Sequence, residues 1–126
     1  CHDLSEGGLS VALAEMCIGG RLGCHINILH NPITELFSES NGRLLVEITP
    51  ENHTAFRELF ENNELGSLIH YLGQVIQEPI MRIMQLGLEN SDRVFKKFKN
   101  PELLLELPLE KLVAAWQQPQ FAGVVA

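Results

Sequence analysis

The first eight residues carry groups suited to binding a phosphate. Asp3 and Ser5 lie in a polar stretch, and Gly7 and Gly8 precede an apolar run. A helix beginning at this point has backbone N–H groups without partners and a partial positive charge from its dipole. Glycines let an anion approach those amides, a serine hydroxyl donates to a phosphate oxygen, and a carboxylate is a hard ligand for Mg²⁺. The stretch therefore predicts a site for a phosphate and its magnesium ion.

A purely structural role also explains these residues. Ser5 could simply cap the helix, because serine is among the residues preferred at that position. Gly7 and Gly8 could serve only to let the helix begin in close contact with its neighbours. Taken alone, the residues slightly favour the structural role.

A second polar segment, Ser38 to Arg43, could contact a sugar phosphate. Ser38 and Glu39 offer a hydroxyl and a carboxylate, and the guanidinium of Arg43 suits phosphate oxygens. The alternative is an ion pair between Glu39 and Arg43 that braces the loop. The residues leave both possibilities open.

Regular apolar spacing predicts the elements that flank these segments. Helical spacing that stops at Gly19 predicts a buried helix, formed by Leu9, Ala12, Leu13, Met16 and Cys17. Alternation from Gly23 to Leu29 predicts a strand, and Asn31-Pro32 predicts a turn into a short helix that runs through Phe37. The mostly apolar run from Arg43 to Ile48 predicts a central strand.

The second half of the chain alternates in the same way. Thr49-Pro50 predicts the start of a helix whose inner stripe packs on the sheet, with Ala55, Phe56, Leu59 and Phe60 as its members. The other predicted elements are a strand at 67–77 with a bulge or close approach at Gly73, its hairpin partner at 80–86, a basic helix at 92–99, an edge strand at 103–107 and a last helix at 109–117. This pattern predicts one α+β domain with a mixed, mostly antiparallel sheet and packed helices.

Composition limits the classes of function. The net charge of −7 argues against binding nucleic acid, and no apolar run is long enough to span a bilayer. The three cysteines are odd in number and lack metal-ligand spacing, and Cys17 lies on the apolar face of the first helix. We expect Cys17 to be a reduced core residue, which fits a cytoplasmic protein.

Two segments resemble one enzyme family. Residues 2–9, HDLSEGGL, and 11–16, VALAEM, resemble the H-D-x-S-[DE]-G-G-L and ALAEM motifs of phosphoribosylformylglycinamidine synthase. Residues 36–43, LFSESNGR, resemble the L-F-S-E-S-x-G-R motif of the same family, in the same order and at a fitting spacing. A weaker likeness covers residues 109–116. The family is the ATP-dependent ligase of the fourth step of purine biosynthesis.

The resemblance implies a place for the chain in a larger enzyme. It matches the closing domain of the second of two repeats, so we expect residues 1–126 to be a fragment with an AIR-synthetase C-terminal-domain-like, partly ferredoxin-like fold. The whole enzyme converts formylglycinamide ribonucleotide, ATP and glutamine-derived ammonia into the amidine. Implied partners are preceding domains of the same chain, a glutaminase subunit and a small subunit. The isolated fragment is expected to be inactive.

The resemblance also assigns roles to residues. It implies that Asp3 binds magnesium, that Ser5 binds a phosphate of ATP or ADP, and that Gly7 and Gly8 offer backbone amides. The segment with Ser38, Glu39 and Arg43 corresponds to a stretch that contacts substrate in the first repeat.

Two alternatives stay open. One is another ATP enzyme of the superfamily, such as aminoimidazole ribonucleotide synthetase or selenophosphate synthetase, although these carry different glycine segments at the helix start. The other is a non-catalytic interaction domain of the same fold. The sequence that precedes Cys1 would distinguish them, since the ligase requires an upstream nucleotide-binding half.

Overall fold

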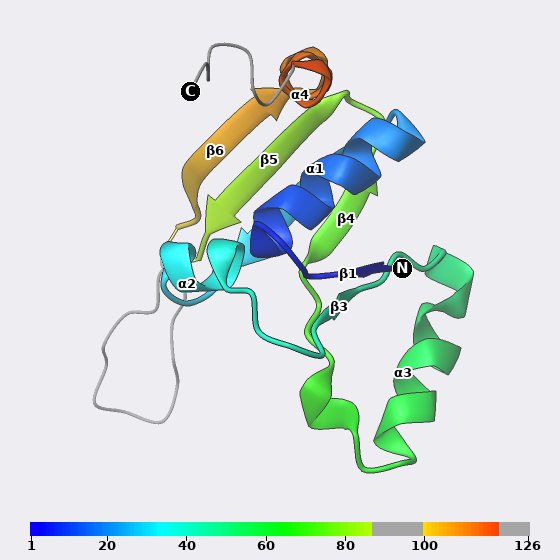
Figure 1. The fold of residues 1–126 in the computed structure, drawn as a ribbon. Coiled ribbons are helices and arrows are strands. Elements are labelled where there is room, and N and C mark those ends of the chain that lie inside the picture. Colours follow the sequence, from blue (N-terminus) through cyan, green and yellow to red (C-terminus); the bar gives the residue numbers. More distant parts are fainter. Residues whose placement is uncertain (87–99, 119–126) are drawn as a thin grey trace.

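The computed structural model describes residues 1–86 and 100–118, which form an α+β domain (Figure 1). Its four-stranded sheet has the order β4 (Gly73–Ile76), β2 (Gly23–Ile28), β5 (Ile80–Gln85) and β6 (Glu102–Pro108). β2 and β5 are parallel, and both outer pairs are antiparallel. The predicted mixed, mostly antiparallel sheet is confirmed, with β6 at its edge. Because β2 and β5 are direct neighbours, the likeness to a ferredoxin-like split βαβ unit is only partial.

One face of the sheet carries α1 and the core. α1 (Gly8–Gly20) crosses this face and contacts β2, β5, α2 (Pro32–Phe37) and α4 (Leu109–Gln117) (Figure 1). The apolar sides of α1 and the two central strands form the core, with Leu9, Ala12, Leu13, Cys17, Cys24, Ile26, Ile28, Met81 and Ile83 as its main members. The predicted first helix, the strand from Gly23 and the helices at 32–37 and 109–117 are therefore confirmed. No helix in the described part of the chain has the length and hydrophobicity of a membrane span.

Two cysteines meet inside this core. Cys17 of α1 and Cys24 of β2 are buried and unoxidised, as predicted for Cys17. A hydrogen bond to the Cys17 sulfur raises the pKa of the Cys24 thiol, and burial raises it further. The Cys24 side chain therefore stays protonated near neutral pH and behaves as a small apolar group.

The apolar run at 43–48 is not a central strand, contrary to the prediction. Only Leu44–Leu45 (β3) pairs, and its antiparallel partner is β1 (His2–Asp3) in a separate two-stranded sheet. Leu44 and Val46 are 64% and 41% exposed. The central places of the large sheet are already taken, because β2 is paired with β4 on one side and with β5 on the other.

The predicted hairpin between residues 67–77 and 80–86 is also wrong. β4 is limited to Gly73–Ile76, and β2 lies between β4 and β5. The connection from β4 to β5 therefore passes over the start of β2, where a Cβ on Gly23 would overlap the carbonyl oxygens of Glu78 and Ile80. The close approach predicted at Gly73 is confirmed, because a Cβ there would overlap the carbonyl oxygen of His25. The predicted helix at 92–99 lies outside the described residues.

α3 (His53–Glu61) does not pack on the sheet, contrary to the prediction. It follows the short 3₁₀ turn η1 (Pro50–Asn52), contacts η1 and the turn η2 (Gly66–Leu68), and projects away from the sheet (Figure 1). None of its residues is buried, and Leu59 is 60% exposed. The apolar stripe exists as predicted, but its aromatic members contact one another: the ring centroids of Phe56 and Phe60 lie 5.0 Å apart.

The packing of α3 sets the expected cost of removing a ring from it. Burial against the sheet would make Phe56→Ala cost about 3–5 kcal/mol of unfolding free energy. Because Phe56 is only half-buried, we expect a cost below about 3 kcal/mol, of which the contact with Phe60 supplies about 0.5–1.5 kcal/mol. Urea denaturation of the wild type and the variant measures this difference. A loss of about 3 kcal/mol or more would contradict this packing and would place α3 against an apolar surface outside the described residues 1–86 and 100–118.

Candidate functional site

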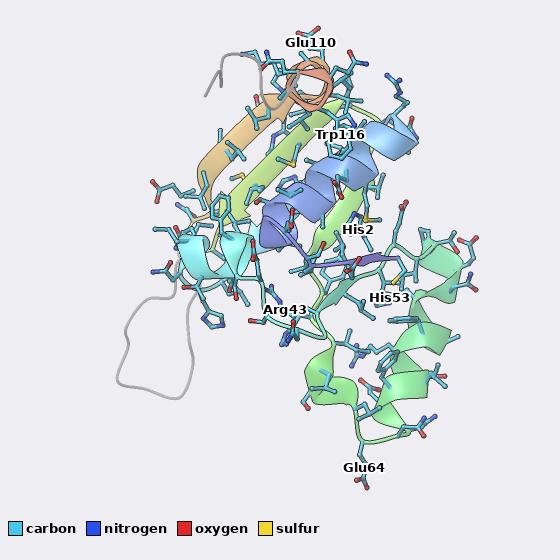
Figure 2. The ribbon with its side chains drawn as sticks, viewed as in Figure 1. His2, Arg43, His53, Glu64, Glu110 and Trp116 are labelled. Atoms are coloured by element: carbon cyan, nitrogen blue, oxygen red, sulfur yellow. The ribbon has the colours of Figure 1, made fainter. Side chains whose placement is uncertain are left out.

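The pairing of β1 with β3 brings the two predicted site segments together. Beyond this ladder, the Leu4 N–H donates to the Arg43 carbonyl at 3.0 Å. His2 and Arg43, labelled in Figure 2, mark the two segments that this pairing joins. Between the segments lies an open pocket of about 350 Å³, lined by Asp3, Leu4, Ser5, Glu6, Glu39, Asn41, Gly42, Arg43 and Leu44. Residues predicted for two different ligands therefore share one pocket.

Ser5 does not cap α1, which removes one of the two structural explanations for the motif. The helix begins at Gly8, and the N-cap position is taken by Gly7, which makes no side-chain capping hydrogen bond. The Ser5 carbonyl accepts the Gly8 N–H at 3.2 Å, so Ser5 holds the turn through its backbone. Its exposed hydroxyl is left to line the pocket.

The two glycines have different surroundings. Gly8 has φ +63°, and a Cβ there would lie 2.9 Å from the backbone of Leu36, Phe37 and Ser38 at the end of α2. Gly8 therefore provides the close packing that the structural explanation proposed. Gly7 has φ +79°, and its N–H donates to a side chain of the second segment.

That side chain is Glu39. Its Oε1 accepts the Gly7 N–H at 2.9 Å, although the two residues are 32 positions apart. The carboxylate thus occupies the positive end of α1, a position suited to an anion. The sequence identified Glu39 and Gly7 separately but not their contact, since no local spacing links them.

Arg43 braces the loop in a different way from the predicted ion pair. Its guanidinium donates to the Ser38 carbonyl at 3.2 Å and to the Glu35 carbonyl at 3.4 Å, at the C-terminal end of α2. Among the described residues no ion pair joins it to Glu39, contrary to that alternative. Ser38 lies outside the pocket lining, and its hydroxyl shares a 2.9 Å hydrogen bond with that of Ser40.

The charges around the pocket favour a cation. Three of the lining side chains are the carboxylates of Asp3, Glu6 and Glu39, and the one basic lining group is Arg43. In residues 1–86 and 100–118, no three His, Cys, Asp or Glu side chains are arranged to hold a metal by themselves. A site with one protein carboxylate still suits Mg²⁺, which keeps several waters and completes its shell with phosphate oxygens. The exposed Asp3 carboxylate fits that requirement.

His2 ties the segment that carries Asp3 to α1. Its Nε2 contacts the Glu15 carboxylate on the helix, and its Nδ1 lies 2.6 Å from the Asp3 carbonyl oxygen. The backbone hydrogen bond to Asp3 and then the Glu15 carboxylate raise the pKa of the His2 imidazole. The contact with Glu15 holds β1 against α1, and the contact with Asp3 lies within β1.

Sequence comparison relates the chain to proteins of known family. Residues 1–84 match the family described as AIR synthase related protein, C-terminal domain. The chain is 50% identical over 86 residues to the phosphoribosylformylglycinamidine synthase subunit PurL of Thermobifida fusca. It is 42% identical over 91 residues to that subunit of Lactobacillus helveticus. These matches cover 68% and 72% of the chain but 11% of each relative, so the chain spans about a tenth of their length.

Structural comparison gives the same relationship. Thermotoga maritima PurL complexed with ATP matches 87% of the chain with a TM-score of 0.63 and 25% identity. The same protein complexed with FGAR, and the T. maritima PurLQS structure, each match 88% of the chain with a TM-score of 0.64 and 25% identity. The matched parts make up 17–18% of those chains.

Proposed function

Because the chain belongs to the family of C-terminal domains of AIR synthase related proteins, we propose that it is one domain of a longer phosphoribosylformylglycinamidine synthase. Identities of 42–50% to PurL subunits favour this enzyme over the other ATP enzymes of the superfamily. The longer enzyme would convert formylglycinamide ribonucleotide to the amidine with ATP and ammonia. The same proposal places this chain in that enzyme as the closing domain of the second of two repeats.

We propose that the pocket at the start of α1 binds the phosphates of ATP or ADP with magnesium. The observation that carries this is the convergence of Asp3 and Ser5 on one pocket at the N-terminus of a 13-residue helix, where the Gly7 N–H donates to the lining residue Glu39. Asp3 would hold Mg²⁺, Ser5 would donate to a phosphate oxygen, and Gly7 would offer its amide. Gly8 supports this amide by closing the turn onto α2. A likeness to PurL complexed with ATP supports the choice of ligand.

The acidity of the pocket explains why magnesium would be needed. Three carboxylates against one guanidinium repel a phosphate that arrives without a cation. Bound Mg²⁺ would supply charge neutralisation for phosphate oxygens, which is the main requirement of phosphoryl-transfer sites. The residues of this chain then act by positioning: Asp3 fixes the ion and Ser5 orients the phosphate.

The opposite wall of the pocket is the proposed contact to substrate. Glu39 and Arg43 line it, and Arg43 brings the positive charge that a sugar phosphate requires. Ser38 would contribute through the hydroxyl pair with Ser40 that shapes the loop. The remaining walls would come from preceding domains of the same chain, as is common for ligand sites. A glutaminase subunit and a small subunit would supply ammonia, in keeping with the likeness to PurLQS.

Calorimetric titration of the longer synthetase with ADP and Mg²⁺ tests this function. Asp3→Asn should weaken magnesium-dependent binding because it removes the charged ligand. Ser5→Ala should weaken binding less, by about 0.5–1.5 kcal/mol, or up to about 3 kcal/mol if the hydrogen bond is to a charged phosphate. Without Mg²⁺, Asp3→Asn should bind no more weakly than the wild type, because the lost carboxylate then only repels the phosphate.

Ser67→Ala is the matched control for Ser5→Ala. Ser67 is an exposed serine of η2 and does not line the pocket. Its replacement should leave nucleotide affinity unchanged. If Asp3→Asn bound ADP and Mg²⁺ as tightly as the wild type, Asp3 would have only a structural role.

A further inference from the structure

We propose that Glu39 sets the nucleotide affinity of this pocket by competing with the phosphate for the Gly7 amide. The inference rests on the proposed function of the pocket and adds a residue that opposes binding. It concerns one contact, the 2.9 Å hydrogen bond from the Gly7 N–H to the Glu39 carboxylate.

Gly7 carries the amide over which the two anions compete. The N–H of Gly8 is already directed at the Ser5 carbonyl at 3.2 Å, within its own turn. The N–H of Gly7 is instead directed at a side chain from another segment, 32 residues away. A carboxylate oxygen and a phosphate oxygen are both anionic acceptors, so each can satisfy this donor and neither can share it well. A phosphate reaches Gly7 only after the Glu39 oxygen leaves.

The surroundings of Glu39 allow it to leave without a change of fold. Its side chain is exposed, and in the described part of the chain no ion pair holds it. The backbone on either side is fixed independently, by the Ser38 N–H to the Thr34 carbonyl at 3.1 Å and by the Leu4 N–H to the Arg43 carbonyl at 3.0 Å. Displacement therefore requires a side-chain rotation and leaves the loop in place.

Glu39 opposes the binding of a phosphate through its charge and through its hydrogen bond. Two variants, Glu39→Gln and Glu39→Ala, distinguish these two effects. Its charge adds to those of Asp3 and Glu6 in the pocket, and its oxygen fills the Gly7 amide. Glu39→Gln removes the charge but keeps a carbonyl oxygen that can accept from Gly7. Glu39→Ala removes both. Glu6→Gln is the control, because it removes a pocket charge from a residue that does not contact the Gly7 amide.

The experiment is calorimetric titration of the longer synthetase with ADP and Mg²⁺, in the wild type and these three variants. Glu39→Ala should bind about tenfold more tightly, equivalent to about 1.4 kcal/mol, because the phosphate no longer displaces a charge-assisted hydrogen bond from the Gly7 amide. The gain in nucleotide affinity of Glu39→Gln should be no larger than that of Glu6→Gln. Unchanged or weaker binding in Glu39→Ala would overturn the proposal, as would an equal gain in Glu39→Ala and Glu6→Gln.

Asp3→Asn, measured beside them, separates this inference from the function on which it rests. If Asp3→Asn weakens binding and Glu39→Ala does not strengthen it, the pocket binds nucleotide and the competition is refuted. If neither variant changes affinity, both proposals fail. Glu39→Gln is nearly isosteric with the wild type, so its titration stays informative even if Glu39→Ala perturbs the loop.

Discussion

Replacing Gly23 by alanine is expected to destabilise the chain by at least about 3 kcal/mol, at or above the usual upper limit for overpacking. Gly23 is buried at the start of β2, where the connection from β4 to β5 crosses it. A Cβ would overlap the carbonyl oxygens of Glu78 and Ile80 and would lie 2.7 Å from the Ile80 nitrogen. All three atoms belong to the backbone, so relief requires moving the start of β5 away from its parallel partner.

The measurement is urea denaturation, read as the change in midpoint at constant slope. Gly19→Ala is the matched control, because a Cβ there meets nothing within 4 Å and the residue lies in α1. Alanine is the better helix former, so Gly19→Ala should gain up to about 1 kcal/mol. A Gly23→Ala variant as stable as the wild type would mean that the β4–β5 connection does not cross β2.

Replacing Gly8 by alanine is expected to cost about 2–5 kcal/mol, the sum of a left-handed backbone for a residue with Cβ, about 1–2 kcal/mol, and overpacking, about 1–3 kcal/mol. Gly8 has φ +63° and touches the backbone at the end of α2. The added methyl group would push that backbone outward, and with it the loop that carries Glu39. Nucleotide affinity of the longer synthetase should therefore change together with stability.

Gly42→Ala separates the two causes. Gly42 also has a positive φ, +79°, but a Cβ there meets nothing within 4 Å. The Gly42→Ala variant should lose only the backbone contribution to stability, about 1–2 kcal/mol. Denaturation midpoints of both variants give the comparison. Equal losses in Gly8→Ala and Gly42→Ala would show that the contact with α2 adds nothing.

The local sequence pattern was sufficient for elements that their own apolar spacing or start signal identifies. The stripe of α1, the alternation of β2 and the Asn31-Pro32 start of α2 each reflect local backbone and burial preferences, and their positions agree with the structure. Pro32 is the first residue of α2, as predicted, and the Asn31 side chain accepts from the N–H groups of Ile33 and Thr34.

Pattern failed where the partner lies far along the chain. The apolar run at 43–48 reads as a central strand, yet β1 is its partner, and the short link at Pro79 reads as a hairpin, yet β2 intervenes. The amphipathic spacing of α3 predicts that one side of the helix is packed, but it does not identify the element that packs against that side. At the site, Asp3 and Ser5 on one segment and Glu39 and Arg43 on another were identified as separate candidates. Their common pocket and the Gly7–Glu39 contact depend on the β1–β3 pairing, which no local pattern encodes.

The most direct test of the nucleotide site is a crystal structure of the longer synthetase with ADP and Mg²⁺. We expect a phosphate oxygen within hydrogen-bonding distance of the Ser5 hydroxyl and the Gly7 N–H, magnesium on the Asp3 carboxylate, and the Glu39 side chain turned away from Gly7. A nucleotide bound elsewhere, with no phosphate or metal at Asp3 and Ser5 and the Gly7–Glu39 hydrogen bond intact, would contradict the account.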